Sequence, residues 1–414
     1  MKQEWKLYMV EHYKFEYPAL RIILFSIWIL ICFTLYPLLI NLTLLNSFFF
    51  MAALSGSLGL YGHYFFKQQG WIFYGLFGFI SLLVFTLLKL LLDPPLQTYL
   101  VLIVLIWFFG CIHFILHMID PSKNRSSVIQ SFGIYASVPI FILISNYSLM
   151  LSSQHHPLVQ DEWLMAIDGT LGIYPSLIIG RFIRALPEGV SNVLDILYLT
   201  LPLAFILVYL RQPDFGAKTA RNFLIEFILI GAVGFVLYNV IPGCGSRFAF
   251  SKTWPDTLPV EFLQNGPRLI YCPVSLPRNC LPSLHMAWII CLVRRSWQCD
   301  GLTKIFVSIL ALATLISMFG IGAHYLVDLI VGFAFANCIG GLSSIQLSWS
   351  NKARWQATLF GGLLCVVWYV IIMFGLTTLQ LSKILAWAIF LSSVLISIYL
   401  EWNLLKEQSL KEQR

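Results

Sequence analysis

Charged side chains are scarce in this sequence. Asp, Glu, Lys and Arg account for 11% of the 414 residues, whereas hydrophobic residues account for 59%. A soluble globular domain carries charge on about 25% of its residues. Together with a mean hydropathy of +0.81, the shortage of charge excludes a soluble globule and predicts an all-α polytopic membrane protein.

Several other signals are also missing. The sequence contains no nucleic-acid-binding motif, no short internal repeat and no low-complexity tract. The first apolar run begins at Leu20, is too long for the core of a signal peptide and lacks a small-residue cleavage site. We therefore expect no nucleic-acid partner, and we expect this first run to stay in the membrane as an anchor.

Long apolar runs are present about twelve times, each near the roughly 20 residues that an α-helix needs to cross a bilayer. The expected spans are Leu20–Ile40, Leu44–Phe66, Trp71–Leu92, Thr98–Ile119, Val128–Leu151, Val190–Leu210, Asn222–Ile241, Leu281–Trp297, Ile305–Ile321, Ala323–Leu347, Ala357–Leu376 and Leu381–Leu400. We expect a functional core of six helices over residues 128–347. Further membrane helices in 1–127 precede this core, and membrane helices and a tail in 348–414 follow it.

The distribution of Lys and Arg predicts which helix ends face the cytoplasm. With the N-terminus in the cytoplasm, most of the 26 Lys and Arg fall on that side, as the positive-inside rule requires. Loops that face anionic lipid then explain the net charge of +7. Segments 152–189 and 242–279 lie outside, the first as an amphipathic interfacial segment and the second as an ordered irregular cap. Four basic residues gather in the second segment: Arg247, Lys252, Arg268 and Arg278.

Three cysteines share the same outer segment. Cys244, Cys272 and Cys280 are close enough in sequence for two of them to form a disulfide in an oxidising periplasm or lumen. Three cysteines permit three pairings, and their spacing selects none of them.

The string HYLVD, from His324 to Asp328, places an imidazole and a carboxylate at the start of an apolar run. Four residues make about one helical turn, so we expect the two side chains on one face of a helix. The carboxylate can then hydrogen-bond one imidazole nitrogen and leave the other free to attack an electrophile. An ionisable residue inside a membrane helix indicates function by default.

The string PSLH, from Pro282 to His285, begins another apolar run. Pro282 suits the first helical position and Ser283 the first turn, which leaves outward-pointing backbone N–H groups that attract phosphate. His285 is then placed to protonate a leaving oxygen. Taken alone, PSLH also fits an ordinary helix cap with an interfacial histidine.

One expected span, Ile305–Ile321, separates the two strings. One helix runs inward from PSLH and the next returns, so both strings begin at the same outer surface. We therefore expect His285, His324 and Asp328 to share a site on the non-cytoplasmic face. These groups can act as acid, nucleophile and orienting group in phosphoryl transfer.

PSLH followed by HYLVD resembles the second and third signature motifs of the type 2 phosphatidic acid phosphatase superfamily. IPGCGSRFAF at 241–250, the segment with Asp161 and Asp168, and LDILY at 194–198 resemble its inositol phosphorylceramide synthase branch, which acts on sphingolipids. The resemblance covers about half of the chain.

This resemblance implies a six-helix core and a covalent mechanism. A phosphoenzyme would form on His324, Asp328 would orient that imidazole, and His285 would donate the proton. The resemblance implies that neither a metal nor a cofactor is required.

The sequence departs from the superfamily pattern at the groups that bind phosphate. The first signature motif, a Lys followed seven residues later by Arg-Pro, is absent, and Met318 stands where an Arg is expected six residues before the second histidine. A phosphodiester carries a single negative charge and needs less compensation than a phosphomonoester dianion. We expect four residues to hold one such phosphate: Arg247, Lys252, Arg278 and Ser283.

The sequence therefore predicts a lipid phosphotransferase that moves a phospho-head group from a phospholipid donor to a lipid alcohol. A lipid phosphate phosphatase of the same superfamily is the alternative, because water can replace the alcohol. A proton-coupled transporter would use His324 and Asp328 as a relay, but such sites usually lie near the bilayer midplane at a repeat interface. The enzyme would reside in a bacterial inner membrane or a Golgi membrane.

Overall fold

The computed structural model of the chain describes residues 53–54, 56–58, 60, 107, 110–119, 125–211, 218–257 and 266–412. The chain divides into two compact units, Met1–Pro139 and Ile140–Arg414. The four expected spans that precede residue 127 lie largely outside the described residues. The count of twelve membrane helices therefore stays a prediction.

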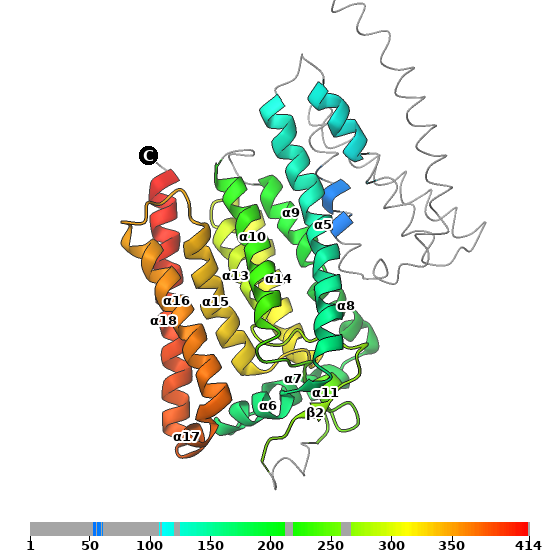
Figure 1. The fold of residues 1–414 in the computed structure, drawn as a ribbon, viewed down its shortest axis with the longest axis vertical. Coiled ribbons are helices and arrows are strands. Elements are labelled where there is room, and N and C mark those ends of the chain that lie inside the picture. The colour runs from blue at the N-terminus through cyan, green and yellow to red at the C-terminus, as the bar shows by residue number, and fades with distance from the viewer. Residues whose placement is uncertain are drawn as a thin grey trace, which may run out of the picture. The chain divides into compact units, whose positions relative to one another are not determined.

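Helices dominate the described residues (Figure 1). Five of these helices are long and apolar enough to cross a membrane, or up to seven if each of two bent pairs is counted as one span. The prediction of an all-α polytopic membrane protein is confirmed at this level. The elements are α5 (Arg125–His155), β1 (Leu158–Val159), α6 (Asp161–Thr170), α7 (Pro175–Ala185), α8 (Glu188–Leu199), α9 (Leu201–Arg211), α10 (Lys218–Leu237), α11 (Ser246–Ala249), β2 (Ile270–Tyr271), α13 (Leu284–Ser296), α14 (Gly301–Gly320), α15 (Leu326–Ser343), α16 (Lys352–Val370), η3 (Ile371–Gly375), α17 (Leu376–Gln380) and α18 (Lys383–Glu412).

Most expected spans after residue 127 coincide with single helices, but two differ. The span expected at Val190–Leu210 is bent by 53° between α8 and α9. Pro202 explains the break, because proline has no N–H to donate and is accommodated in the first turn of a new helix. The helix of the span expected at Leu281–Trp297 is α13, which has only 13 residues. At about 1.5 Å per residue it is shorter than a bilayer core is thick.

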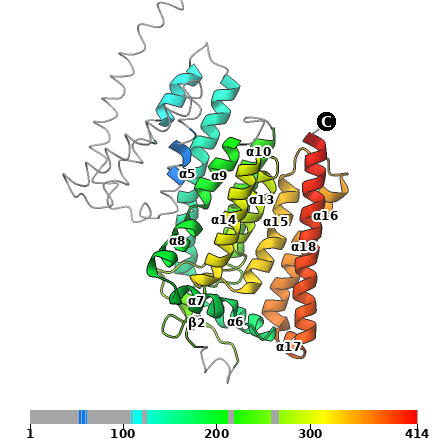
Figure 2. The same ribbon diagram turned by 180° about the vertical axis from the view of Figure 1, so that it is seen from behind.

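Helix α15 lies at the centre of the second unit. It contacts α6, α10, α13, α16 and α18. Figures 1 and 2 show α15 running side by side with α10, α13, α16 and α18. The apolar span of α15 is 78% buried, whereas those of the α16–α17 segment and of α18 are each 28% buried. Helix α15 is therefore covered by protein on most sides, while α16 and α18 keep faces suited to lipid.

The expected outer segment 152–189 folds as two short helices that meet at 96°. The bend lies between α6 and α7, where Gly172 has a φ of 74° and Pro175 opens the second helix. Both helices lie across the ends of the long helices (Figures 1 and 2).

The second outer segment, 242–279, is ordered mainly through turns and the short helix α11 in its described part. It is joined to the first segment by a two-residue antiparallel pairing, in which Leu158 opposes Tyr271 and Val159 opposes Ile270. The two segments that were predicted to lie outside, 152–189 and 242–279, are therefore connected, and together they are called the outer layer below.

Candidate active site

The PSLH string forms the N-terminal cap of α13. Ser283 is the N-cap residue, and its Oγ accepts a hydrogen bond from the backbone N–H of Met286 at 3.3 Å. The helix begins at Leu284, so Pro282 precedes the cap and does not take the first helical position predicted from the sequence. The reason is that a serine hydroxyl can satisfy a free end N–H of the helix, which a proline ring cannot do. His285 consequently lies in the first turn.

The HYLVD string straddles the start of α15. The helix begins at Leu326, so His324 lies just before it while Asp328 lies in the first turn. Asp328 Oδ2 accepts a hydrogen bond from the Tyr325 N–H at 2.9 Å and lies 3.4 Å from His324 Nδ1. The predicted proximity of the two side chains holds, but it does not arise from a shared helix face. It arises because a carboxylate at the third helical position folds back over the helix start.

A sharp turn between α14 and α15 directs His324 inward. Gly322 has a φ of 66°, a conformation that favours glycine. The backbone N–H groups of Ala323 and His324 both donate to the Met318 carbonyl at 3.1 Å. A Cβ at Gly322 would also lie only 2.7 Å from the Trp254 ring. The turn therefore depends on glycine for two independent reasons.

The two strings meet at one end of the long helices. The Ser283 N–H donates to the Asp328 carbonyl at 3.0 Å. The ring centroids of His285 and His324 are 6.1 Å apart, and the Ser283 hydroxyl is 3.3 Å from His324 Nε2. His324, Asp328 and Ser283 are all buried. The single return helix α14 thus places the two strings together, as the alternation of expected spans predicted.

Tyr198, near the end of α8, contacts both imidazoles. Its ring stacks on His285 with centroids 3.7 Å apart, and its hydroxyl lies 3.5 Å from His324 Nε2. The sequence offered no role for Tyr198 beyond its place in LDILY. An aromatic residue in an apolar helix is ordinarily a packing residue, so the sequence has no local signal that marks it as part of the site.

The two nitrogens of His324 face different groups. Nδ1 lies within ion-pair distance of Asp328, although the two atoms are not aligned as a hydrogen bond. Nε2 faces the hydroxyls of Ser283 and Tyr198. A carboxylate beside Nδ1 favours the tautomer that carries its proton there, so Nε2 is the nitrogen with a free electron pair.

Two buried carboxylates of α6 hold the start of α15. Asp168 accepts hydrogen bonds from the backbone N–H groups of Leu326 at 2.8 Å and Val327 at 3.2 Å. Asp161 Oδ1 accepts from the Tyr325 hydroxyl at 2.9 Å and from the Gly245 N–H at 2.8 Å. The Asp168 bonds satisfy first-turn N–H groups of α15, and Asp161 joins the Tyr325 side chain to the backbone of the second outer segment. The sequence did not predict that Asp161 and Asp168 hold the start of α15.

Cys280 lies beside His324 and Asp328, and ligand atoms of the three residues are within 4.8 Å of one another. Burial raises the pKa of the Cys280 thiol well above its ordinary value. The thiol donates a hydrogen bond to the Ala323 carbonyl at 3.3 Å.

Met318 occupies the place where the superfamily pattern expects an arginine. Its side chain is buried, and its Sδ accepts a hydrogen bond from the Ser283 hydroxyl at 3.3 Å. The position therefore faces the site without supplying charge. A cation for a substrate phosphate must come from another part of the chain.

Arg278, one of the residues expected to bind phosphate, is used within the outer layer. Its guanidinium is buried and donates to the carbonyl oxygens of His156, Cys272, Pro273 and Leu276 at 2.7 to 3.2 Å. Four of its five N–H groups are thus engaged by backbone. This geometry favours a structural function for Arg278, because loop carbonyls without helix or strand partners need such a donor. Its binding of phosphate stays a prediction.

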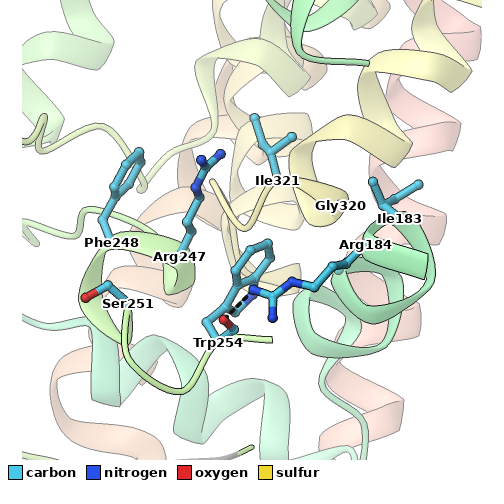
Figure 3. A pocket seen from close by; sticks show the side chains of 9 residues that line it. Ile183, Arg184, Arg247, Phe248, Ser251, Trp254, Gly320 and Ile321 are labelled. Carbon is cyan, nitrogen blue, oxygen red and sulfur yellow. Dashed lines mark hydrogen bonds between the residues drawn. The ribbon is translucent and has the colours of Figure 1, made fainter. Parts of the chain in front are cut away.

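Arg247 lines a hollow of about 370 Å³ beside the turn that leads to His324 (Figure 3). Arg184 of α7 and Arg247 of α11 contribute from different elements, and Trp254 lies between them in this view. Arg184 is neutralised by Asp256 at 2.8 Å, whereas Arg247 has no ion pair among the described residues. Lys252, also expected to bind phosphate, is exposed in the turn that follows α11 and does not line the hollow.

The hollow is joined through the backbone to the turn between α14 and α15. The Arg247 N–H donates to the Gly322 carbonyl at 3.0 Å, and Ile321 contributes to the lining. Its volume falls in the usual range of small-ligand sites, about 300–1,000 Å³. The hollow is therefore lined both by a guanidinium without an ion pair, that of Arg247, and by Ile321, which lies three residues before His324.

Residues 162–342 match the family model described as the PAP2 superfamily. No curated protein and no solved structure matches the chain. The matched segment contains α13, α14 and α15 up to residue 342, and with them Tyr198, Ser283, His285, His324 and Asp328. The match supports the type 2 phosphatidic acid phosphatase superfamily for this chain, and with it an enzyme of the phosphatase or phosphotransferase type.

Proposed function

We propose that this protein is a membrane lipid phosphotransferase. It moves a phospho-head group from a phospholipid to a lipid alcohol through a phosphohistidine on His324. The finer assignment within the superfamily, to a branch that resembles inositol phosphorylceramide synthase, is part of the same proposal. The reaction takes place at the non-cytoplasmic surface of a bacterial inner membrane or a Golgi membrane.

One observation carries the proposal: two imidazoles from different helices are 6.1 Å apart, and one of them lies beside a buried carboxylate. A phosphorus atom bound to His324 Nε2 would have its leaving oxygen within reach of His285. Nucleophile, orienting group and proton donor are the set that a double displacement on phosphorus needs.

In the first half-reaction, the electron pair of His324 Nε2 attacks the phosphorus of the donor. A P–N bond forms and the P–O bond to the diacylglycerol-like alcohol breaks. His285 gives its proton to the departing oxygen, and Asp328 stabilises the positive charge that develops on His324. Tyr198 and Ser283 supply hydroxyl donors beside Nε2 that can contact the phosphoryl oxygens.

In the second half-reaction, the hydroxyl of the acceptor lipid attacks the same phosphorus. Its proton passes to His285, the P–N bond breaks, and His324 returns to its neutral form. The product is the acceptor esterified with the phospho-head group. If water enters in place of the lipid alcohol, the same steps hydrolyse the donor, which is the phosphatase alternative.

The charge balance supports a phosphodiester donor. Met318 leaves the site without the expected arginine, and Arg278 is engaged by backbone carbonyls. Arg247 is then the basic group in the hollow that no carboxylate neutralises. A single guanidinium matches the single negative charge of a phosphodiester better than the two charges of a phosphomonoester.

The direct test is a lipid conversion assay on purified protein in liposomes that contain EDTA. We expect His324→Ala, His285→Ala and Asp328→Ala to lose activity by about 10²-fold or more, while each variant still inserts and folds. The chelator should have no effect on the unmodified protein. His155→Ala is the matched control, because His155 is an exposed histidine of the outer side.

A donor labelled in its phosphate distinguishes the covalent mechanism from direct transfer. We expect an acid-labile, alkali-stable label on the protein when the acceptor is omitted, and no such label on His324→Ala. Full turnover by His324→Ala would remove that residue as nucleophile. Products formed only with water would select the phosphatase, and solute uptake that depends on a proton gradient would select the transporter.

A further inference from the structure

The outer layer contains two cysteines in direct contact. The Sγ atoms of Cys244 and Cys272 are 2.9 Å apart and both residues are buried. The two thiols are free in the structure and joined by a hydrogen bond. A disulfide needs about 2.05 Å between the sulfur atoms. The third cysteine of this layer, Cys280, instead donates to the Ala323 carbonyl.

Each of the two cysteines is held in place by its own set of contacts. The Cys244 N–H donates to Asp161 Oδ2 at 3.0 Å. The Cys272 N–H donates to the Pro157 carbonyl at 2.9 Å, and the Cys272 carbonyl accepts from Arg278 at 2.7 Å. With Val159, the two side chains form a small hydrophobic cluster. Bond formation would therefore require only a small shift of the sulfur atoms and no rearrangement of the chain.

We propose that Cys244 and Cys272 form a disulfide that clamps the outer layer next to the turn between α14 and α15. The pairing selects one of the three combinations that the sequence left open. The bond closes a segment whose ends are 28 residues apart and which carries Arg247. The bond itself is independent of the proposed function, whereas its effect on catalysis rests on that function.

The chemistry requires an oxidant from the outer compartment, and a disulfide-bearing thiol oxidoreductase is of the right class. Its S–S bond breaks as the Cys244–Cys272 S–S bond forms. Two electrons and two protons pass from the two thiols to the oxidant, which leaves as a dithiol. The hydrogen-bonded Cys244 thiol and the nearby Arg278 guanidinium lower the pKa of Cys272, which favours the thiolate that begins the exchange.

The clamp connects directly to the groups that hold His324. Asp161 accepts hydrogen bonds from the backbone N–H groups of Cys244 and Gly245 and from the Tyr325 hydroxyl. A disulfide at Cys244 restrains the unfolded chain and thereby stabilises the folded position of this segment. Reduction should consequently loosen the support of Tyr325 and the start of α15.

Mass spectrometry tests the bond without any lipid assay. The protein is taken from membranes, its free thiols are alkylated under denaturing conditions, and it is digested without reduction. We expect a cross-linked peptide pair containing Cys244 and Cys272 that separates on reduction, together with alkylated Cys280. Alkylation of both Cys244 and Cys272 before reduction, or a cross-link that includes Cys280, would overturn the proposal.

Thermal unfolding followed by tryptophan fluorescence tests the clamp. A phosphine reductant should lower the unfolding temperature of the unmodified protein and of the control Cys111→Ser by several degrees. It should not lower that of the double variant Cys244→Ser/Cys272→Ser, which lacks the bond. An equal response of the double variant would contradict the clamp, even if the lipid assay supports the proposed function.

Discussion

At the scale of single residues, the candidate site depends on contacts that the PSLH and HYLVD strings do not reveal by themselves. Asp328 serves both as the cap of α15 and as the neighbour of His324 Nδ1. Tyr198 stacks on one imidazole and places its hydroxyl near the other. If His324 is the nucleophile, as we propose, a polar group that faces its Nε2 can stabilise charge on the phosphoryl oxygens as the transition state forms.

Replacement of Tyr198 by phenylalanine separates these two functions of the side chain. The ring of Tyr198→Phe should still stack on His285, so the thermal stability should change little. We expect kcat to fall by about 10²-fold while KM changes little, because the lost hydroxyl acts on the transition state. Steady-state kinetics in liposomes provides the measurement. An unchanged kcat would assign Tyr198 to packing alone.

At the scale of elements, α6 supports the start of α15. Its two aspartates reach the start of α15 from a segment far away in the sequence. Asp168 accepts from two backbone N–H groups of the first turn, and Asp161 accepts from the Tyr325 hydroxyl. The helix is therefore held in place by groups that do not take part in the chemistry. The angle between α6 and α7 brings α7 to the hollow while α6 stays beneath α15.

Replacement of Asp168 by alanine tests this support. Asp168→Ala leaves the N–H groups of Leu326 and Val327 without their acceptor, at a cost of about 1–3 kcal/mol in the free energy of unfolding. Asp168→Asn is the matched control, because its side-chain oxygen can still accept one of these hydrogen bonds. Thermal unfolding in detergent should rank the proteins as unmodified, Asn and then Ala. Equal unfolding temperatures for Asn and Ala would contradict the capping function.

At the scale of the whole second unit, buried charges join three helices. Glu226 of α10 pairs with Arg294 and Arg295 of α13, and Arg294 also pairs with Glu401 of α18 at 2.5 Å. The positive-inside rule predicts that Arg294 and Arg295, like most Lys and Arg of the sequence, face the cytoplasm. Both are in fact buried, because the carboxylates of neighbouring helices neutralise them.

Removal of Glu226 should destabilise the unit strongly. Glu226→Ala leaves two buried guanidinium groups with only one remaining carboxylate, and breaking a buried pair in this way costs about 3–5 kcal/mol. Glu401→Ala should cost less, because Glu401 is partly exposed and contacts only Arg294. Unfolding in detergent, followed by fluorescence, measures both variants. A larger effect for Glu401→Ala would show that this ranking by burial is wrong.

The sequence predicted the helices and the meeting of the two histidines, because these depend on patterns that are local or topological. Hydrophobic runs revealed the helices from Val128 onward, and the parity of one return helix brought His285 and His324 to the same end. The exact first residue of each helix was harder to predict from the sequence, because a side-chain cap at Ser283 or Asp328 shifts the helix start by one or two residues. The hydrogen bonds of Arg278 to backbone carbonyls were not predicted. No sequence pattern distinguishes a loop arginine that binds phosphate from one that donates to the backbone.

The amino-acid sequence by itself determined that this chain is a membrane protein, because the length and composition of apolar runs can be read from the order of residues. It also determined that two histidines and an aspartate converge at helix ends, because alternate membrane crossings return the chain to the same surface. Only the tertiary structure decided which other groups join them. Tyr198, Asp161 and the Cys244–Cys272 contact all link residues that are far apart in sequence; Asp161 and Tyr325, for example, are 164 positions apart. Such contacts depend on how helices and loops pack in three dimensions, and no periodicity or spacing along the chain records them.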